Sequence, residues 1–179
     1  MTTNAELAIL TLLAEQPRHG YEIEAVIEER GMREWTEIGF SSIYYVLKKL
    51  EKAAWVQGRL AQAGRGPARK VYELTPAGRD ELRAAVLDAL SVPRRCYLPL
   101  QLGLANLGGV PPDEALAALR QYREALAERL ANVRARWEAQ RPLPYFVEAT
   151  FTHSIALIEA ELAWVKGFIE KMEVGDVQS

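Results

Sequence analysis

Between residues 151 and 172 the apolar side chains recur at alternating intervals of four and three residues, the most regular pattern in the chain. This spacing places them on one side of an α-helix, as in the seam of a coiled coil. The stripe consists of Phe151, Ile155, Ile158, Leu162, Val165, Ile169 and Met172. Leu157, Trp164 and Phe168 widen it beyond what one helix of the same chain would cover. We therefore expect the stripe to pair two chains; the alternative is an intramolecular helical hairpin.

A second long helix is expected just before this one. The sequence Pro111-Pro112-Asp113-Glu114 is typical of a helix start, because proline fits the first turn and acids complement the helix dipole. Apolar residues then occupy heptad positions as far as Trp137, and Arg141-Pro142 ends the pattern. Residues 113–174 are thus predicted to form a helical dimerisation domain.

The N-terminal residues 1–90 have the pattern of a separate small domain. Thr3 and Glu6 have the spacing of a capping box and predict a helix start. A second helix is expected from about Gly20 to Gly31. A third carries one apolar stripe, formed by Ile43, Val46, Leu47 and Leu50.

Two short β-prone runs follow, at residues 55–60 and 70–74, with a glycine-rich turn at residues 64–67 between them. They predict a β-hairpin. Thr75-Pro76 then starts a fourth helix that runs to about Leu90, and residues 91–112 are expected to be a connector. The predicted fold is mainly α with a small β-hairpin wing: a winged helix-turn-helix domain followed by a helical C-terminal dimerisation domain.

The charge of the chain is unevenly distributed. The net charge is −2, yet the window from Ser41 to Tyr72 holds seven basic residues and one acid, a net charge of +6. This segregation favours a polyanionic partner. An α-helix with hydroxyls and cations opposite its apolar stripe fits the major groove of double-stranded DNA. The predicted DNA contacts are Ser41, Ser42, Tyr44, Tyr45, Lys48, Lys49, Lys52, Arg65, Arg69 and Lys70. Tyr21 and Tyr72 are expected to be core aromatics.

Several fragments in order resemble PadR-type transcription regulators. They are His19-Gly20-Tyr21-Glu22-Ile23, the helix from Ser41 to Glu51, Tyr72 to Gly78, and, near the C-terminus, His153-Ser154-Ile155 and Glu159 to Trp164. The resemblance implies a homodimeric DNA-binding regulator, usually a repressor that binds an inverted repeat and is sometimes released by a small molecule such as a phenolic acid. Ser41 and Tyr45 stand where many members have glycine and proline, so the operator sequence does not carry over.

An effector site is a further expectation. Aromatic side chains and a few polar groups near the domain junction are typical of a small-ligand pocket. The residues are Tyr97, Tyr145, Phe146, Glu148, His153 and Trp164. A small aromatic or phenolic ligand is the expected effector, and a core histidine packed beside aromatics is the alternative for His153.

Other classes of function have little support in the sequence. The single cysteine, Cys96, argues against a disulfide framework and for a reducing, cytoplasmic location. His19 and His153 lie far apart, so no metal is expected, and neither a cofactor motif nor an enzyme's polar cluster is present. No signal peptide or membrane span is expected. The remaining alternative is a winged-helix protein-interaction adaptor that does not bind specific DNA sequences.

Overall fold

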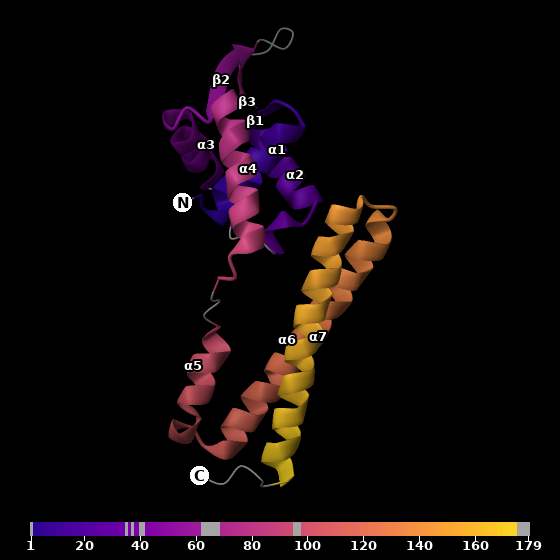
Figure 1. The fold of residues 1–179 in the computed structure, drawn as a ribbon. Coiled ribbons are helices and arrows are strands. Elements are labelled where there is room, and N and C mark those ends of the chain that lie inside the picture. Colours follow the sequence, from indigo (N-terminus) through magenta and orange to yellow (C-terminus); the bar gives the residue numbers. More distant parts are fainter. Residues whose placement is uncertain are drawn as a thin grey trace. The chain divides into compact units, whose positions relative to one another are not determined.

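The computed structural model describes residues 2–34, 36, 38–39, 42–61, 69–94 and 98–174. Three predicted site residues, Ser41, Arg65 and Tyr97, lie outside these ranges. The chain divides into two compact units, Met1–Arg95 and Cys96–Ser179 (Figure 1). Among the described residues, no helix has the length and hydropathy that a bilayer crossing requires.

The first unit is built on four helices: α1 (Asn4–Glu15), α2 (Gly20–Glu29), α3 (Ser42–Lys52) and α4 (Pro76–Ser91), with a 3₁₀ turn, η1 (Met32–Glu34), after α2. Its core consists of fully buried aliphatic side chains from α1, α2 and α3, among them Ile9, Leu10, Ile23, Ile27, Ile43 and Leu47. The apolar faces that the helical periodicity predicted are therefore buried in the structure.

The capping box predicted at the start of α1 is confirmed. The Glu6 backbone N–H donates to Thr3 Oγ1 at 3.3 Å, and the Thr3 N–H donates to the Glu6 carboxylate at 2.7 Å. Two backbone donors at the start of the helix thus have partners.

The predicted β-hairpin also forms, from β2 (Val56–Ala61) and β3 (Arg69–Leu74). A third strand, β1 (Arg18–His19), adds to β3, so the antiparallel sheet has the order β1-β3-β2. The sequence does not predict β1, because two residues are too few to show a strand period.

A close backbone contact holds the start of α4 against the residues that precede β2. Thr75 caps the helix, accepting a hydrogen bond from the Gly78 N–H at 3.0 Å, and its hydroxyl donates to the Ala54 carbonyl at 2.7 Å. A Cβ at Gly78 would lie 1.9 Å from the Trp55 carbonyl oxygen. Only glycine allows this contact.

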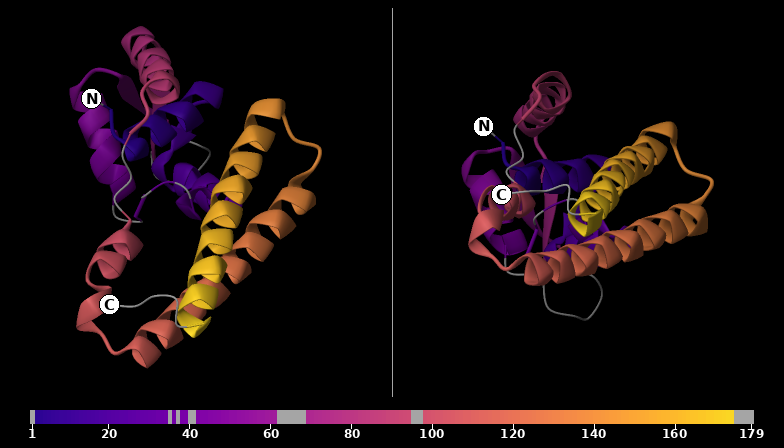
Figure 2. Two further views of the ribbon diagram at one scale, coloured as in Figure 1. Left: turned by 60° about the horizontal axis from the view of Figure 1, so that its bottom comes forward. Right: turned by 90° about the horizontal axis from the view of Figure 1, so that it is seen from below.

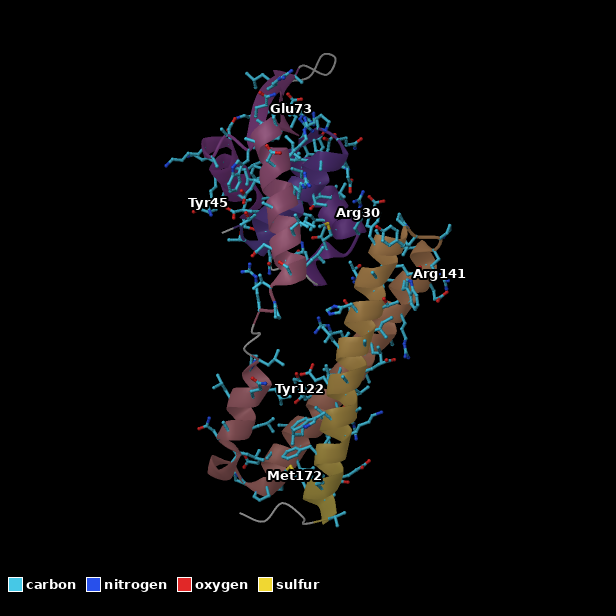
Figure 3. All side chains as sticks on the ribbon, in the orientation of Figure 1. Arg30, Tyr45, Glu73, Tyr122, Arg141 and Met172 are labelled. Carbon is cyan, nitrogen blue, oxygen red and sulfur yellow. The ribbon has the colours of Figure 1, made fainter. Side chains whose placement is uncertain are left out.

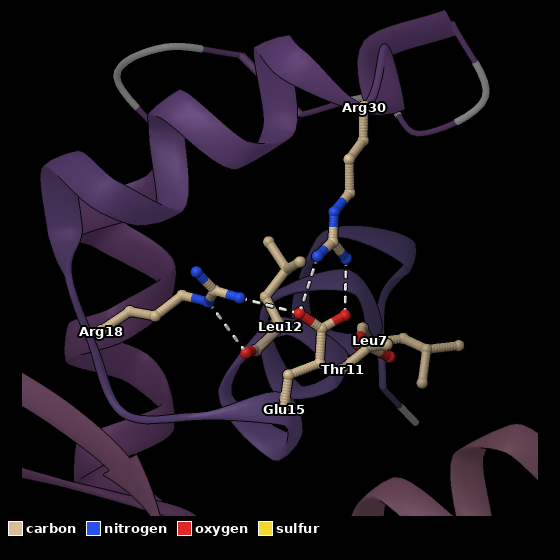
Figure 4. A network of polar contacts seen from close by, with 6 residues as sticks. All are labelled: Leu7, Thr11, Leu12, Glu15, Arg18 and Arg30. Atoms are coloured by element: carbon tan, nitrogen blue, oxygen red, sulfur yellow. Dashed lines mark hydrogen bonds and ion pairs between the residues drawn. The ribbon is translucent and has the colours of Figure 1, made fainter. Parts of the chain in front are cut away.

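A polar network joins the end of α1 to the segments around α2 (Figure 4). The Glu15 carboxylate accepts hydrogen bonds from Arg18 at 2.8 Å and from Arg30 at 2.5 and 2.9 Å. Arg18 is buried and also donates from Nε to the Leu12 carbonyl at 3.2 Å. The Arg30 hydrogen bonds, more than the opposing effect of burial, lower the pKa of Glu15.

The second unit contains α5 (Pro99–Ala105), a 3₁₀ turn η2 (Leu107–Gly109), α6 (Pro112–Gln140) and α7 (Tyr145–Val174). The helices α6 and α7 lie side by side as a hairpin (Figures 1 and 2). Leu119, Leu126 and Leu130 of α6 pack against α7, and the half-buried Leu100 of α5 joins this cluster. The short helix α5 lies where we expected a connector.

The stripe on α7 is buried within the chain, and this corrects our placement of the dimer interface. Ile155, Ile158, Leu162, Val165 and Ile169 are core residues of the hairpin, while Phe151 and Met172 are half-buried. While the hairpin is closed, the five core side chains are not available to a second chain. The alternating spacing of four and three residues correctly predicted that this face is buried, but it does not identify the helix that covers it.

Replacing Glu15 tests the network. Glu15→Gln should lower the free energy of unfolding by about 1–2 kcal/mol at pH 7, because the buried Arg18 loses its charged acceptor. Since the folded-state pKa of Glu15 is lowered, its contribution is present above its ordinary pKa of 4.5 and is lost as the pH falls below that value. Thermal unfolding followed by circular dichroism should show the difference shrinking below pH 4.5.

The control is Glu170→Gln. Glu170 is exposed and makes no hydrogen bond or ion pair with another described residue. This variant should match the unchanged protein at neutral pH. A Glu15→Gln difference that stays equally large at pH 3 would contradict the proposed role of the carboxylate.

Candidate nucleic-acid interface

Packing fixes how α3 is turned about its axis. Ile43, Val46, Leu47 and Leu50 are all buried against the core of the first unit. At 100° per residue, the direction opposite this stripe passes through Tyr45, Lys48 and Lys52, and Tyr44 and Lys49 lie on its two flanks. The central side chains and the flanking side chains have different surroundings.

Tyr44, on one flank, packs against the start of α2. A Cβ added to Gly20 would lie 2.6 Å from Tyr44 Cε1, so the ring covers the bare glycine backbone. Part of Tyr44 remains exposed. This contact holds one edge of α3 against α2.

Lys49, on the other flank, is bound to α1. Its Nζ lies 2.6 Å from Glu6 Oε1, and the residue Glu6 is only 2 % exposed. Burial raises the pKa of the Glu6 carboxyl, but the hydrogen bonds from Lys49 and Thr3 outweigh burial and the pKa lies below its usual value. The hydrogen bond to Glu6 also raises the pKa of Lys49. Lys49, which we predicted to be a DNA contact, therefore has a structural partner within the chain.

The centre of the outer face is open. Figure 3 shows Tyr45 at the edge of the first unit, on α3. Tyr45, Lys48 and Lys52 are exposed, and none makes a hydrogen bond, ion pair or ring contact with another described residue. Ser42 differs, because its hydroxyl donates to the Gly39 carbonyl at 2.5 Å. Three of the predicted contacts on α3 thus face outward without a partner in the described chain.

The hairpin also carries cations that have partners. Lys70 Nζ lies 2.7 Å from the Glu51 carboxylate, whose hydrogen bond raises the pKa of Lys70, and 5.2 Å from the centre of the Tyr72 ring. Arg59 pairs with Glu73 at 2.6 Å. The positive charge of this segment is therefore partly neutralised.

Beside the hairpin lies a cluster of rings and cations that no sequence pattern predicts. The rings of His19 and Tyr21 stack at 5.4 Å, and the guanidinium of Arg69 lies 5.1 Å from the Tyr21 ring centre. His19 Nδ1 is 3.1 Å from the Lys70 carbonyl oxygen. Tyr21 is 46 % exposed, so our expectation of a core aromatic is wrong for it, whereas Tyr72 is half-buried against the core. The strand pairing of β1 with β3 brings these distant residues together, and no local pattern indicates that pairing.

The residues expected to form an effector pocket are dispersed. Tyr145, Phe146, Glu148, His153 and Trp164 all lie on α7, and all are at least partly exposed. Tyr145 and Trp164 are separated by about 28 Å along the helix, at 1.5 Å per residue. Glu148 lies 4.0 Å from Arg141 in a weak ion pair. One chain therefore does not gather these five residues around a single small molecule.

The first unit has the architecture of a winged helix-turn-helix, with an exposed helix face beside a β-hairpin. The family model for the transcriptional regulator PadR-like family matches residues 9–84, and the chain belongs to this family.

Two sequence relatives each match a little under half of this chain. An uncharacterized protein X of Lysinibacillus sphaericus is 32% identical over 80 residues, which are 45% of this chain and 72% of that protein. An uncharacterized 37.1 kDa protein of a Streptomyces fradiae transposon is 39% identical over 82 residues. The match takes in 45% of this chain but only 21% of the length of that protein.

Solved structures share the fold along most of the chain. Bacillus subtilis PadR in complex with operator DNA has a TM-score of 0.77 at 21% identity, covering 93% of this chain and 98% of that one. The same regulator in complex with p-coumaric acid has a TM-score of 0.75 at 19% identity, covering 95% and 99%. The Vibrio cholerae virulence activator AphA has a TM-score of 0.76 at 16% identity, covering 95% and 98%.

Two adjacent lysines on α3 provide a matched test of this geometry. Lys49→Ala should lower the melting temperature by a few degrees, because the buried Glu6 carboxylate loses its cation. Lys48→Ala should leave the melting temperature unchanged, because Lys48 is exposed and unpaired within the described chain. In a Glu6→Gln background the effect of Lys49→Ala should disappear. Equal melting temperatures for the two single variants would refute the assigned pairing.

Proposed function

We propose that this chain binds double-stranded DNA as a homodimer, with α3 in the major groove and the hairpin against the backbone. The observation that supports DNA binding most directly is the outer face of α3, where Lys48 and Lys52 lie on the same side of the helix as Tyr45 with no acid paired to them among the described residues. B-DNA admits one α-helix in its major groove, and lysines there neutralise phosphates or contact guanine. Arg69 extends the same charge onto the hairpin, next to Tyr21.

The homodimer is supported by a second apolar face on α7. Phe146, Leu157 and Trp164 are large and exposed, at 61%, 59% and 48%. They recur at intervals of eleven and seven residues, close to three and two helical turns, and lie on a different side of the helix from the stripe that contacts α6. Phe168 supports this face from beside it, because its ring stacks on Trp164 at 5.1 Å. A row of exposed apolar residues on a regular helix is typical of an isologous dimer contact.

A two-fold dimer presents two copies of α3 to two half-sites, and the operator is then an inverted repeat. Occupation of a promoter by such a dimer would make the protein a repressor. The p-coumaric acid complex of the B. subtilis regulator supports the proposal of a small aromatic effector for this chain as well. The dispersed aromatics on α7 do not by themselves indicate where such an effector binds.

Selection from a random duplex pool tests DNA binding. The full chain should enrich an inverted repeat, and its affinity should fall steeply with salt. Lys48→Ala and Lys52→Ala should each lower affinity and reduce the slope of log affinity against log salt by about 1. Lys70→Ala is the matched control, and its effect should be smaller because Lys70 is paired with Glu51. A pool with no enriched sequence would favour the protein-interaction adaptor.

The dimer prediction concerns the second face of α7. Leu157→Glu should convert the protein to a monomer at micromolar concentration, as measured by sedimentation velocity, because a carboxylate would be buried in an apolar contact. Thr152→Glu is the control: this exposed residue lies on the same helix but away from Leu157. A dimer that survives Leu157→Glu together with Trp164→Glu would show that the chains pair elsewhere.

A further inference from the structure

The most exposed large hydrophobic side chain of α3 is the ring of Tyr45. Tyr45 is 70 % exposed and points in nearly the same direction from the helix axis as Lys52, at 100° per residue. An aromatic ring in water is unfavourable compared with a buried one. No packing within the described chain explains a tyrosine here, since it contacts neither the core nor another ring.

The rest of the helix has few side chains that discriminate between bases. The segment Ser42–Lys52 contains no arginine, asparagine or glutamine, which leaves lysine as its only side chain that reads guanine with two hydrogen bonds. Lys48 and Lys52 act as point charges and are equally suited to phosphates. Among the three residues at the centre of the outer face, Tyr45, Lys48 and Lys52, only Tyr45 combines an apolar surface with a hydroxyl.

Neighbouring candidates are held by other contacts. The ring of Tyr44 covers Gly20, and the hydroxyl proton of Ser42 is donated to the Gly39 carbonyl. Tyr44 and Ser42 thus help to position α3. Tyr45 makes no such contact, and its ring is free to meet a partner in the groove.

The major groove has one prominent apolar feature, the 5-methyl group of thymine. We propose that Tyr45 is a specificity-determining residue whose ring contacts the 5-methyl group of one thymine in each half-site. This inference rests on the proposed function, and it goes further by naming the base and the residue that reads it. Lys48 and Lys52 hold the helix in the groove, while Tyr45 selects the thymine.

Deoxyuridine tests this contact, because it differs from thymidine only in lacking the 5-methyl group. The probe is a duplex that the full chain enriches from a random pool, with each thymine replaced singly by deoxyuridine. At one position the affinity of the unchanged protein should fall about fourfold, as expected for losing one buried methyl group. Tyr45→Ala should bind the thymine and deoxyuridine duplexes equally at that position. Tyr45→Phe keeps the ring and should retain the fourfold difference.

Controls separate this inference from the function on which it rests. Lys52→Ala should bind every duplex more weakly and keep the full sensitivity to deoxyuridine. Melting temperatures of the Tyr45 variants should equal that of the unchanged protein, since the side chain is exposed. If Tyr45→Ala keeps the sensitivity at every thymine, or Tyr45→Phe loses it, the ring–methyl contact is wrong while DNA binding stands. If no duplex is enriched, both proposals fall.

Discussion

The burial of one apolar stripe on α3 determines everything that this helix can present to a partner. Ile43, Leu47 and Leu50 are almost completely removed from water, so turning the helix about its axis would expose them and bury lysines instead. Two contacts then hold the flanks of α3. Lys49 forms an ion pair with Glu6 of α1, and the ring of Tyr44 packs against Gly20 of α2. The composition of the outward face is thus a consequence of packing on the inward face.

Ion pairs also reduce the positive charge that this part of the chain can offer to a partner. Counted along the sequence, the window from Ser41 to Tyr72 is strongly basic, but the fold brings Glu6 and Glu73 to it from outside. The ion pairs differ in how deeply their carboxylates are buried. Lys70 and Glu51 are both partly exposed, so exchanging Glu51 for a phosphate costs little. Glu6 is buried, and removing Lys49 from it would leave a carboxylate without its cation.

Local patterns predicted most of the fold, because the determinants of helices lie within a few residues. The Thr3–Glu6 capping box, the Thr75 cap and the apolar periods of α3, α6 and α7 are all found in the structure. The predictions failed where the partner is distant in sequence. Strand β1 depends on pairing with Val71 and Tyr72, and this pairing exposes Tyr21 beside Arg69. The division of the α3 cations into paired and open ones also depends on distant acids.

Helix α7 shows why a wide apolar face is ambiguous in a sequence. Its width is the sum of two narrower faces, one against α6 and one formed by Phe146, Leu157 and Trp164. Within the described part of the hairpin and α3, each chain offers only Lys48, Lys52 and Arg69 as cations without a carboxylate partner. So few charges would give a single chain weak binding to DNA at physiological salt. In the homodimer that we propose, a second α3 held at fixed spacing would make the second contact effectively intramolecular, so the exposed face of α7 and the sparse cations of α3 would serve the same function.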